Sequence, residues 1–257
     1  MFTLRSGVFW CVVLLACAPT ASFGQQRAAK DYPSRPIRLV VPYFAGGGLD
    51  FIGYQLGRKI APVIGQNLFI DNRPGAGGSI GTDVVAKSPP DGYTILLTSS
   101  GHASLPTAYK SLPYDAVKDF KPITLVANSA GFVLLVHPSV PARSVKELIA
   151  LAKARPGKLN YGSAGVGGVL HFVVEAFNLK AGTQLTHVPY KGAAQAVIDL
   201  LAGHIDVVIV GATDALAHSR SGKLRALGIT ALVRWSELPE VPTIDEAGLK
   251  GFKYIAW

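Results

Sequence analysis

Residues 41–50, VPYFAGGGLD, place three consecutive glycines between an apolar run and a helical pattern. The run IRLV before them predicts a buried strand, and the helix that follows has an apolar stripe made by Ile52, Leu56, Ile60 and Ile64. Glycine has no Cβ, so the backbone there can turn sharply or approach a ligand closely. Because the first N–H groups of the helix point into the same space, the loop suits an anion.

Two further loops have the same design. NRPGAGGSIG follows residue 71 and GSAGVGGVLH follows Tyr161, and each leads into a predicted helix. None of the three loops has the Gly-Lys-Ser/Thr ending or the G-x-G-x-x-G spacing of nucleotide-binding loops. One such loop is more often a simple tight turn, but three together predict an anion site built from backbone dipoles.

Strand and helix patterns alternate along the chain, which predicts an α/β protein with mixed, mostly parallel sheets and helices on both faces. The expected strands are 37–42, 67–71, 93–98, 123–127, 131–137, 185–189, 205–210 and 225–230. Capping boxes at Ser144–Glu147 and Thr243–Glu246 predict helix starts. The short polar stretch NSAG, between the fourth and fifth strands, is a plausible crossing point between two lobes.

The first 24 residues have the features of a secretory signal peptide. Arg5 is basic, VFWCVVLLACA is apolar but too short to span a bilayer, and small residues precede Gln25. A transmembrane anchor fits less well because the run breaks at Pro19, and a lipoprotein signal ending at Cys17 remains the second alternative. Both Cys11 and Cys17 lie in this segment, so the exported soluble chain is expected to contain no disulfide.

The formal net charge of +9 favours an anionic partner. Lysines and arginines are scattered singly or in pairs, without aromatic interleaving or a helix-turn-helix pattern. We therefore expect a solvated basic surface and a small acidic ligand, and we expect no nucleic acid.

Two patterns could carry catalysis. Gly77, Ser79 and Gly81 satisfy G-x-S-x-G, which makes a secreted serine hydrolase using Ser79 the alternative function. However, DNRPGA separates this motif from its strand, and Ser79 is better interpreted as a helix cap.

His171 and Glu175 lie one helical turn apart, but a third metal ligand at matching spacing is lacking. His171 is therefore expected to shape the third loop by hydrogen bonding, and no metal or cofactor is predicted.

Several long stretches, taken in order, resemble one family. They are YPSRPIRLVVPYFAGGGLD, NRPGAGGSIGTDVVAKSPPDGYTILLTSS, SLPYDAVKDFKPIT, VHPSVPARSVKELIALAKARPGKLNYGSAGVGG and HVPYKGAAQAVIDLLAGHIDVVI. They are similar to the Bug family of periplasmic solute-binding proteins, also called TctC-type receptors of tripartite tricarboxylate transporters. The resemblance covers 32–257.

The resemblance implies a two-lobed, type II periplasmic-binding-protein-like fold. The first lobe would span 31–128, the second 129–230, and a return segment 231–257. It also implies a periplasmic monomer that binds a small organic carboxylate (a di- or tricarboxylate, an amino acid or an aromatic acid) for the membrane components of such a transporter. No catalysis, metal, nucleotide or nucleic acid is implied.

Site residues are carried over by position from the family's motifs. The expected ligand-binding residues are Phe44, Ala45, Gly46, Gly47, Gly48, Asp50, Ser99, Ser100, His102, Ser163, Gly165, Gly167, Gly168, Tyr190 and Asp206. A side chain at Gly47 is expected to fill the ligand's space or to require a φ that only glycine adopts easily.

The chain departs from the family's pattern at several positions. Ala45 stands where proline is frequent, Leu49 where a hydroxyl residue is frequent, and Gly168 where a hydroxyl residue is common. Leu49 suggests a less polar ligand body, although its side chain could equally point into the core. The ending GFKYIAW resembles the start of a strand returning to the first lobe, and relatives continue through further helices, so the resemblance implies an incomplete first lobe.

Overall fold

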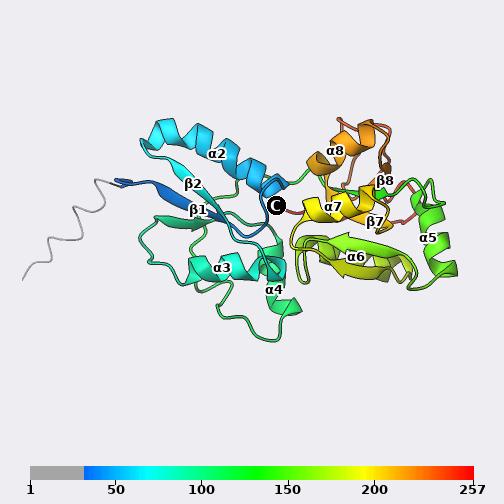
Figure 1. Cartoon of the computed structure of the whole chain (residues 1–257), viewed down its shortest axis with the longest axis horizontal. Coiled ribbons are helices and arrows are strands. Elements are labelled where there is room, and N and C mark those ends of the chain that lie inside the picture. The colour runs from blue at the N-terminus through cyan, green and yellow to red at the C-terminus, as the bar shows by residue number, and fades with distance from the viewer. Residues whose placement is uncertain (1–31) are drawn as a thin grey trace, which may run out of the picture.

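The computed structural model describes residues 32–257, which form two α/β lobes side by side (Figure 1). The predicted signal peptide, with Cys11 and Cys17, lies outside the described residues. Within 32–257, no helix combines the length and the apolar character needed to cross a membrane.

The first lobe is built on a three-stranded parallel sheet in the order β2-β1-β3. Its strands are β1 (Ile37–Val41), β2 (Leu68–Asn72) and β3 (Thr94–Leu96). Helices α2 (Gly48–Ile64) and α3 (Ser79–Ala86) lie on opposite sides of these strands (Figure 1). The short 3-10 helix η1 (Ala76–Gly78) precedes α3, and α4 (Gly101–Ala108) follows β3.

The core of the first lobe is small. Its buried cluster consists of Leu39, Val41 and Leu97, against which partly buried residues of α2, β2 and β3 pack. The apolar stripe predicted on α2 is present, but it is only half-buried and forms one wall of a groove.

The second lobe contains a five-stranded sheet in the order β6-β5-β7-β4-β8. Its strands are β4 (Phe132–Val136), β5 (Asn160–Ser163), β6 (Thr186–Pro189), β7 (Val207–Gly211) and β8 (Arg225–Ile229). Strand β5 is parallel to β6 and β7, whereas β4 is antiparallel to β7 and β8. The helices are α5 (Val145–Ala154), α6 (Val169–Ala181), α7 (Ala193–Leu201) and α8 (Ala212–Arg220).

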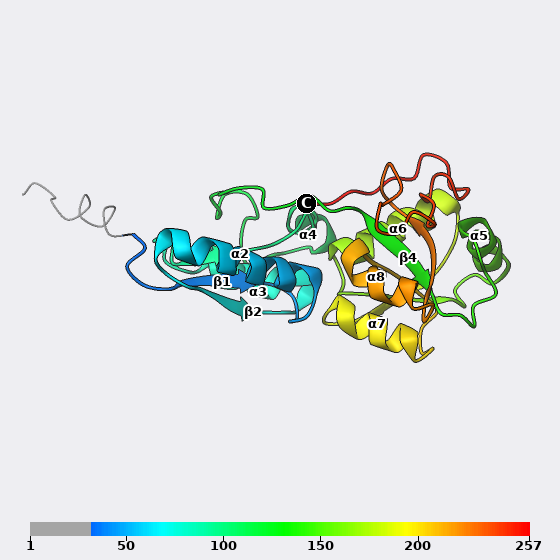
Figure 2. The same cartoon turned by 90° about the horizontal axis from the view of Figure 1, so that it is seen from above.

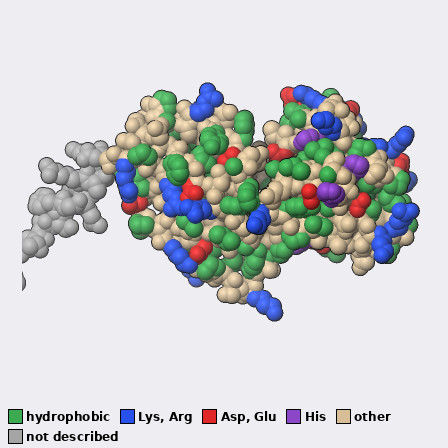
Figure 3. All heavy atoms as spheres, in the orientation of Figure 1, with side chains coloured by type: hydrophobic (Ala, Val, Ile, Leu, Met, Phe, Trp, Pro, Cys, Tyr) green, Lys and Arg blue, Asp and Glu red, His purple; other side chains and the backbone are tan. Residues whose placement is uncertain are grey.

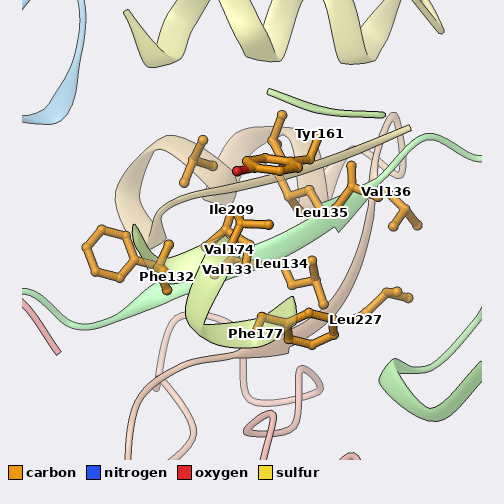
Figure 4. Close-up of a cluster of buried hydrophobic side chains, with 14 of the residues drawn as sticks. Phe132, Val133, Leu134, Leu135, Val136, Tyr161, Val174, Phe177, Ile209 and Leu227 are labelled. Carbon is orange, nitrogen blue, oxygen red and sulfur yellow. The ribbon is translucent and has the colours of Figure 1, made fainter. Parts of the chain in front are cut away.

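A large apolar core holds the second lobe together. Every residue of β4 is buried, and Tyr161, Val174, Phe177 and Ile209 pack around it (Figure 4). Burying side chains of this size stabilises a fold by about 1.5–3 kcal/mol each. The second lobe therefore has much the larger share of the buried apolar core.

The chain crosses between the lobes twice. Residues 121–130 run from the first lobe to β4, and the C-terminus lies between the lobes in both views (Figures 1 and 2). The two crossings meet, because the backbone N–H of Ser129 donates to Ala256 O at 2.9 Å. Most of the return segment stays with the second lobe, since Ile244, Leu249 and Phe252 belong to its core.

The predicted fold class is confirmed, with two corrections to the strands. Residues 123–127 form no strand, because they are exposed and have no neighbouring strand to pair with. Strand β5 was not predicted, because its sequence NYGS is short and contains a glycine. The capping hydrogen bonds form at both motifs: Ser144 Oγ accepts from Glu147 N at 3.2 Å at the start of α5, and Thr243 and Glu246 bond reciprocally. The residues after Thr243 form turns and no helix, so the helix start predicted there was wrong.

Candidate functional site

A cleft with a volume of 1480 Å³ separates the lobes and continues into the apolar groove along α2. Five helices, α2, α4, α6, α7 and α8, begin at or beside its wall, which is lined there by Gly48, Ser99, Gly168, Gly192 and Gly211. The first N–H groups of a helix have no partner within that helix. The cleft therefore collects the positive ends of several helix dipoles.

The loop that opens α2 is held by a buried carboxylate. Asp50 Oδ2 accepts from Gly46 N at 2.9 Å, and Asp50 Oδ1 accepts from Asn72 Nδ2 at 3.0 Å. The same amide group of Asn72 also donates to Tyr43 O at 3.1 Å. Both oxygens of Asp50 are thus occupied, so this side chain organises the glycine loop and leaves the helix N–H groups for a ligand.

The two lobes touch backbone to backbone at the other glycine loops. A Cβ on Gly77, in η1, would lie 2.3 Å from Val166 O and 2.9 Å from Gly168 N. The phenol of Tyr109, the residue that follows the last residue of α4, donates to the same carbonyl oxygen, Val166 O, at 3.0 Å. Only glycine permits this approach at position 77, where φ is 65°.

A stack of aromatic rings supports the third loop from behind. His187 Nε2 shares a 2.6 Å hydrogen bond with the buried Ser163 Oγ, which also accepts from Gly165 N at 3.2 Å. The rings of His171 and His187 stack at 4.3 Å, and burial lowers the pKa of His187 to about 4. Gly167 N donates to His171 Nδ1 at 3.3 Å, which confirms that His171 shapes this loop.

The structure brings many of the predicted site residues to the cleft. Those that line it are Phe44, Gly47, Gly48, Asp50, Ser99, His102 and Gly168. A second group belongs to the same loops but is outside the lining: Ala45 and Gly46, which are exposed, and Ser100, Ser163, Gly165 and Gly167. The ring of His102 turns toward its own lobe, where Nε2 bonds Ala116 O at 2.8 Å and the ring meets Phe120 edge to face.

Two predicted residues lie elsewhere. Asp206 stands at the start of β7, where its Oδ2 accepts from Asn160 N at 2.7 Å, whereas the cleft is at the other end of that strand. The structure therefore places Asp206 away from the cleft, contrary to the sequence-based expectation. Tyr190 is outside the lining as well, and its phenol donates to Asp199 Oδ2 at 2.7 Å.

Sequence reasoning missed the contribution of α7 and α8. Gly192, Ala193, Thr213 and Asp214 line the cleft from the second lobe. The signal was present, since VVIVGATD places a glycine and a helix start directly after a buried strand. It was overlooked because only one glycine marks each of these turns.

Ser79 is not placed as a nucleophile. It is the first residue of α3, it is buried, and no histidine within 32–257 bonds its hydroxyl. It also makes no capping hydrogen bond, so the expectation of a helix cap was wrong.

Among the described residues, no group of three His, Cys, Asp or Glu side chains is arranged to hold a metal ion.

A two-lobed α/β fold with a cleft rich in helix N-termini defines a solute-binding protein of the periplasmic type. The chain belongs to the tripartite tricarboxylate transporter family receptors (TctC), whose family model matches residues 52–257. It is 39% identical to protein BugT of Bordetella pertussis, covering 93% of this chain and 73% of that protein.

Solved structures agree with this family. A protein of R. palustris with adipate is 35% identical at a TM-score of 0.84, covering 88% of this chain and 76% of that one. MatC from Rhodopseudomonas palustris with bound malate is 31% identical, also at 0.84, covering 88% and 77%.

Proposed function

We propose that this chain is an extracytoplasmic solute-binding protein that captures a small organic carboxylate in the interlobe cleft. The observation that carries the proposal is the convergence of several helix N-termini on that cleft. A carboxylate there accepts hydrogen bonds from backbone N–H groups and is favoured by the helix dipoles. The relatives solved with adipate and malate support the same ligand class.

The charged side chains of the lining support capture by the backbone. Among the described residues that line the cleft and its groove, the Asp, Glu, Lys and Arg side chains are Asp50, Asp119, Lys121 and Asp214. Three of the four are acidic, so basic side chains are not the main attraction for an anion. The remaining lining is mostly apolar and suits the hydrocarbon body of an organic acid. Leu49 contributes to it while also packing on the first-lobe core.

The wider assignment follows from the family. We infer that the protein works as a monomer in the periplasm, exported by residues 1–24, and passes its ligand to the membrane components of a tripartite tricarboxylate-type transporter. The ligand leaves unchanged, since Ser79 has no bonded histidine among the described residues to activate it.

A ligand screen tests the proposal. Thermal unfolding of the purified protein should be measured with mono-, di- and tricarboxylates, each beside its neutral amide, for example adipate beside adipamide. A ligand that binds only the native state stabilises it by about 2.7 kcal/mol at a hundredfold excess over Kd. The acids should raise the melting temperature and the amides should not. A folded sample that responds to no carboxylate would refute the proposal.

The variant Gly47→Val tests the position of the site. Gly47 lines the cleft at the start of α2, and an added Cβ would meet no protein atom closer than Phe44 O at 3.8 Å. The valine side chain therefore enters the ligand's space and should abolish binding of the best carboxylate in calorimetry, while the fold is retained. Ala154→Val, exposed at the far end of α5, is the control and should bind normally. Normal binding by Gly47→Val would show that the ligand does not bind beside the start of α2.

A further inference from the structure

Asp214 faces the cleft from the first turn of α8. Its carboxylate lies where the lobes meet: both oxygens are 3.7 Å from the position that a Cβ on Gly48 would occupy, across the cleft. Oδ2 is also 3.3 Å from the corresponding position on Gly211, at the end of β7. The carboxylate is thus held between the first residue of α2 and the start of α8.

No hydrogen bond or ion pair from any residue in 32–257 reaches this carboxylate. Asp50 offers the contrast, because a backbone N–H and an amide occupy both of its oxygens. Burial alone raises the pKa of Asp214 above its ordinary value of 3.8. The side chain is half-buried and lines the cleft, so its carboxylate can accept a hydrogen bond from a bound molecule.

Asp214 also divides the cleft electrostatically. A negative side chain beside the N-termini of α2 and α8 offsets their dipoles and repels a second carboxylate placed there. The N-termini of α4 and α6 meet at another point of the lobe contact, where a Cβ on Gly101 would lie 3.2 Å from Val169 N. At α4, the N–H groups of Gly101, His102 and Ala103 already donate to Ser99 and Ser100. The cleft therefore offers the N–H donors of α6 on one side and an acceptor with negative charge on the other.

We propose that Asp214 selects carboxylates that also carry an ammonium group. The ammonium donates to the Asp214 carboxylate, and the ligand's own carboxylate binds N–H groups at the start of α6, where Val169 and Leu170 line the cleft. A charge-assisted hydrogen bond is stronger than one from a neutral hydroxyl, so amino acids rank above hydroxy acids, and these above plain acids. This inference rests on the proposed function and narrows its ligand class.

Matched ligand pairs test the selection. Calorimetry at neutral pH should compare L-glutamate with glutarate, L-aspartate with succinate, and L-phenylalanine with 3-phenylpropionate. In each pair that binds, the wild type should favour the amino compound by about tenfold or more. Asp214→Asn keeps the shape and removes the charge, so the preference should fall by about tenfold, with the plain acid binding as tightly as before or more tightly.

Glu240→Gln is the matched control, because Glu240 is exposed, outside the cleft lining, and changes the net charge equally. It should keep the wild-type preference. An equal preference in the wild type and Asp214→Asn, or wild-type binding of only the plain acids, would overturn the selection while leaving carboxylate capture intact. Absence of binding by every acid, in a protein shown to be folded, would overturn both proposals.

Discussion

At the scale of single residues, the glycine loop shows what a sequence can and cannot locate. Gly46 has a φ of 86°, whereas Gly47 has a φ of −89° and an extended backbone. The expected need for glycine's special φ therefore belongs to Gly46 and was misplaced on Gly47. Consecutive glycines look alike in a sequence, and the choice between them is made by Asp50 and by Asn72 on the neighbouring strand.

Gly77→Ala should weaken ligand binding by hindering the closed arrangement of the lobes. Its methyl group would meet Val166 O, a backbone atom of the other lobe that cannot move aside cheaply. We expect a loss of about tenfold or more in affinity, and a larger radius of gyration in X-ray scattering with saturating ligand. Gly222→Ala is the control, since φ there is 70° but no atom lies within 4 Å of the new Cβ. Equal affinity in the two variants would show that the contact is not needed for binding.

At the scale of elements, periodicity located most strands and helices, and the errors have physical causes. The segment 123–127 has strand-like residues, yet a strand exists only where another strand offers hydrogen bonds, and none of the described strands lies beside it. Asp206 was assigned to the cleft by its position in the family's motifs, but it lies at the end of β7 that is away from the cleft. Strand direction relative to the cleft is a property of the sheet and cannot be recovered from a local pattern.

The ring stack behind the third loop should make the protein less stable in acid. His187 contacts Tyr161 and His171 by stacking and bonds Ser163, and Glu175 of α6 is the nearby acid, occupied by the Tyr161 phenol at 2.6 Å. Burial, together with the neighbouring His171, lowers the pKa of His187 to about 4 from its ordinary 6.5. As the pH falls, the imidazole is therefore protonated at a higher pH in the unfolded chain than in the folded one. The contribution of neutral His187 to the free energy of unfolding is complete above pH 6.5 and is lost as the pH falls toward 4.

His187→Gln, which retains a polar group near Ser163, should flatten this pH dependence. After allowance for solvent screening, the wild type should lose about 1 kcal/mol more than the variant between neutral pH and pH 4. Thermal unfolding across that window measures the difference. His204→Gln, at a side chain that is 70% exposed, should follow the wild-type curve. Parallel curves for wild type and His187→Gln would exclude His187 as the source.

At the scale of the whole molecule, the sequence indicated three anion-binding loops but not how they are arranged. The first and third loops line the cleft, whereas the second, at 72–81, is outside the lining and contacts the third. Their meeting depends on how the lobes pack, through contacts such as Gly77 with Val166 and Gly192 with Phe44. The contribution of Asp214 is of the same kind, since it matters only because α8 starts opposite α2. Charge, in contrast, is dispersed: on the face shown in Figure 3, lysines and arginines are spread over both lobes.

This separation of surface charge from site chemistry predicts how binding responds to salt. The net charge of +9 should speed the approach of an anion over long distances, and added salt screens that attraction. Inside the cleft, the ligand is held by N–H groups, and Lys121 is the one lysine or arginine among the described lining residues. Stopped-flow measurements from about 20 to 500 mM NaCl should therefore show an association rate that falls several-fold and a dissociation rate that stays constant. Lys121→Met should leave the dissociation rate unchanged. A dissociation rate that rises steeply with salt would instead indicate that a basic side chain holds the ligand's carboxylate.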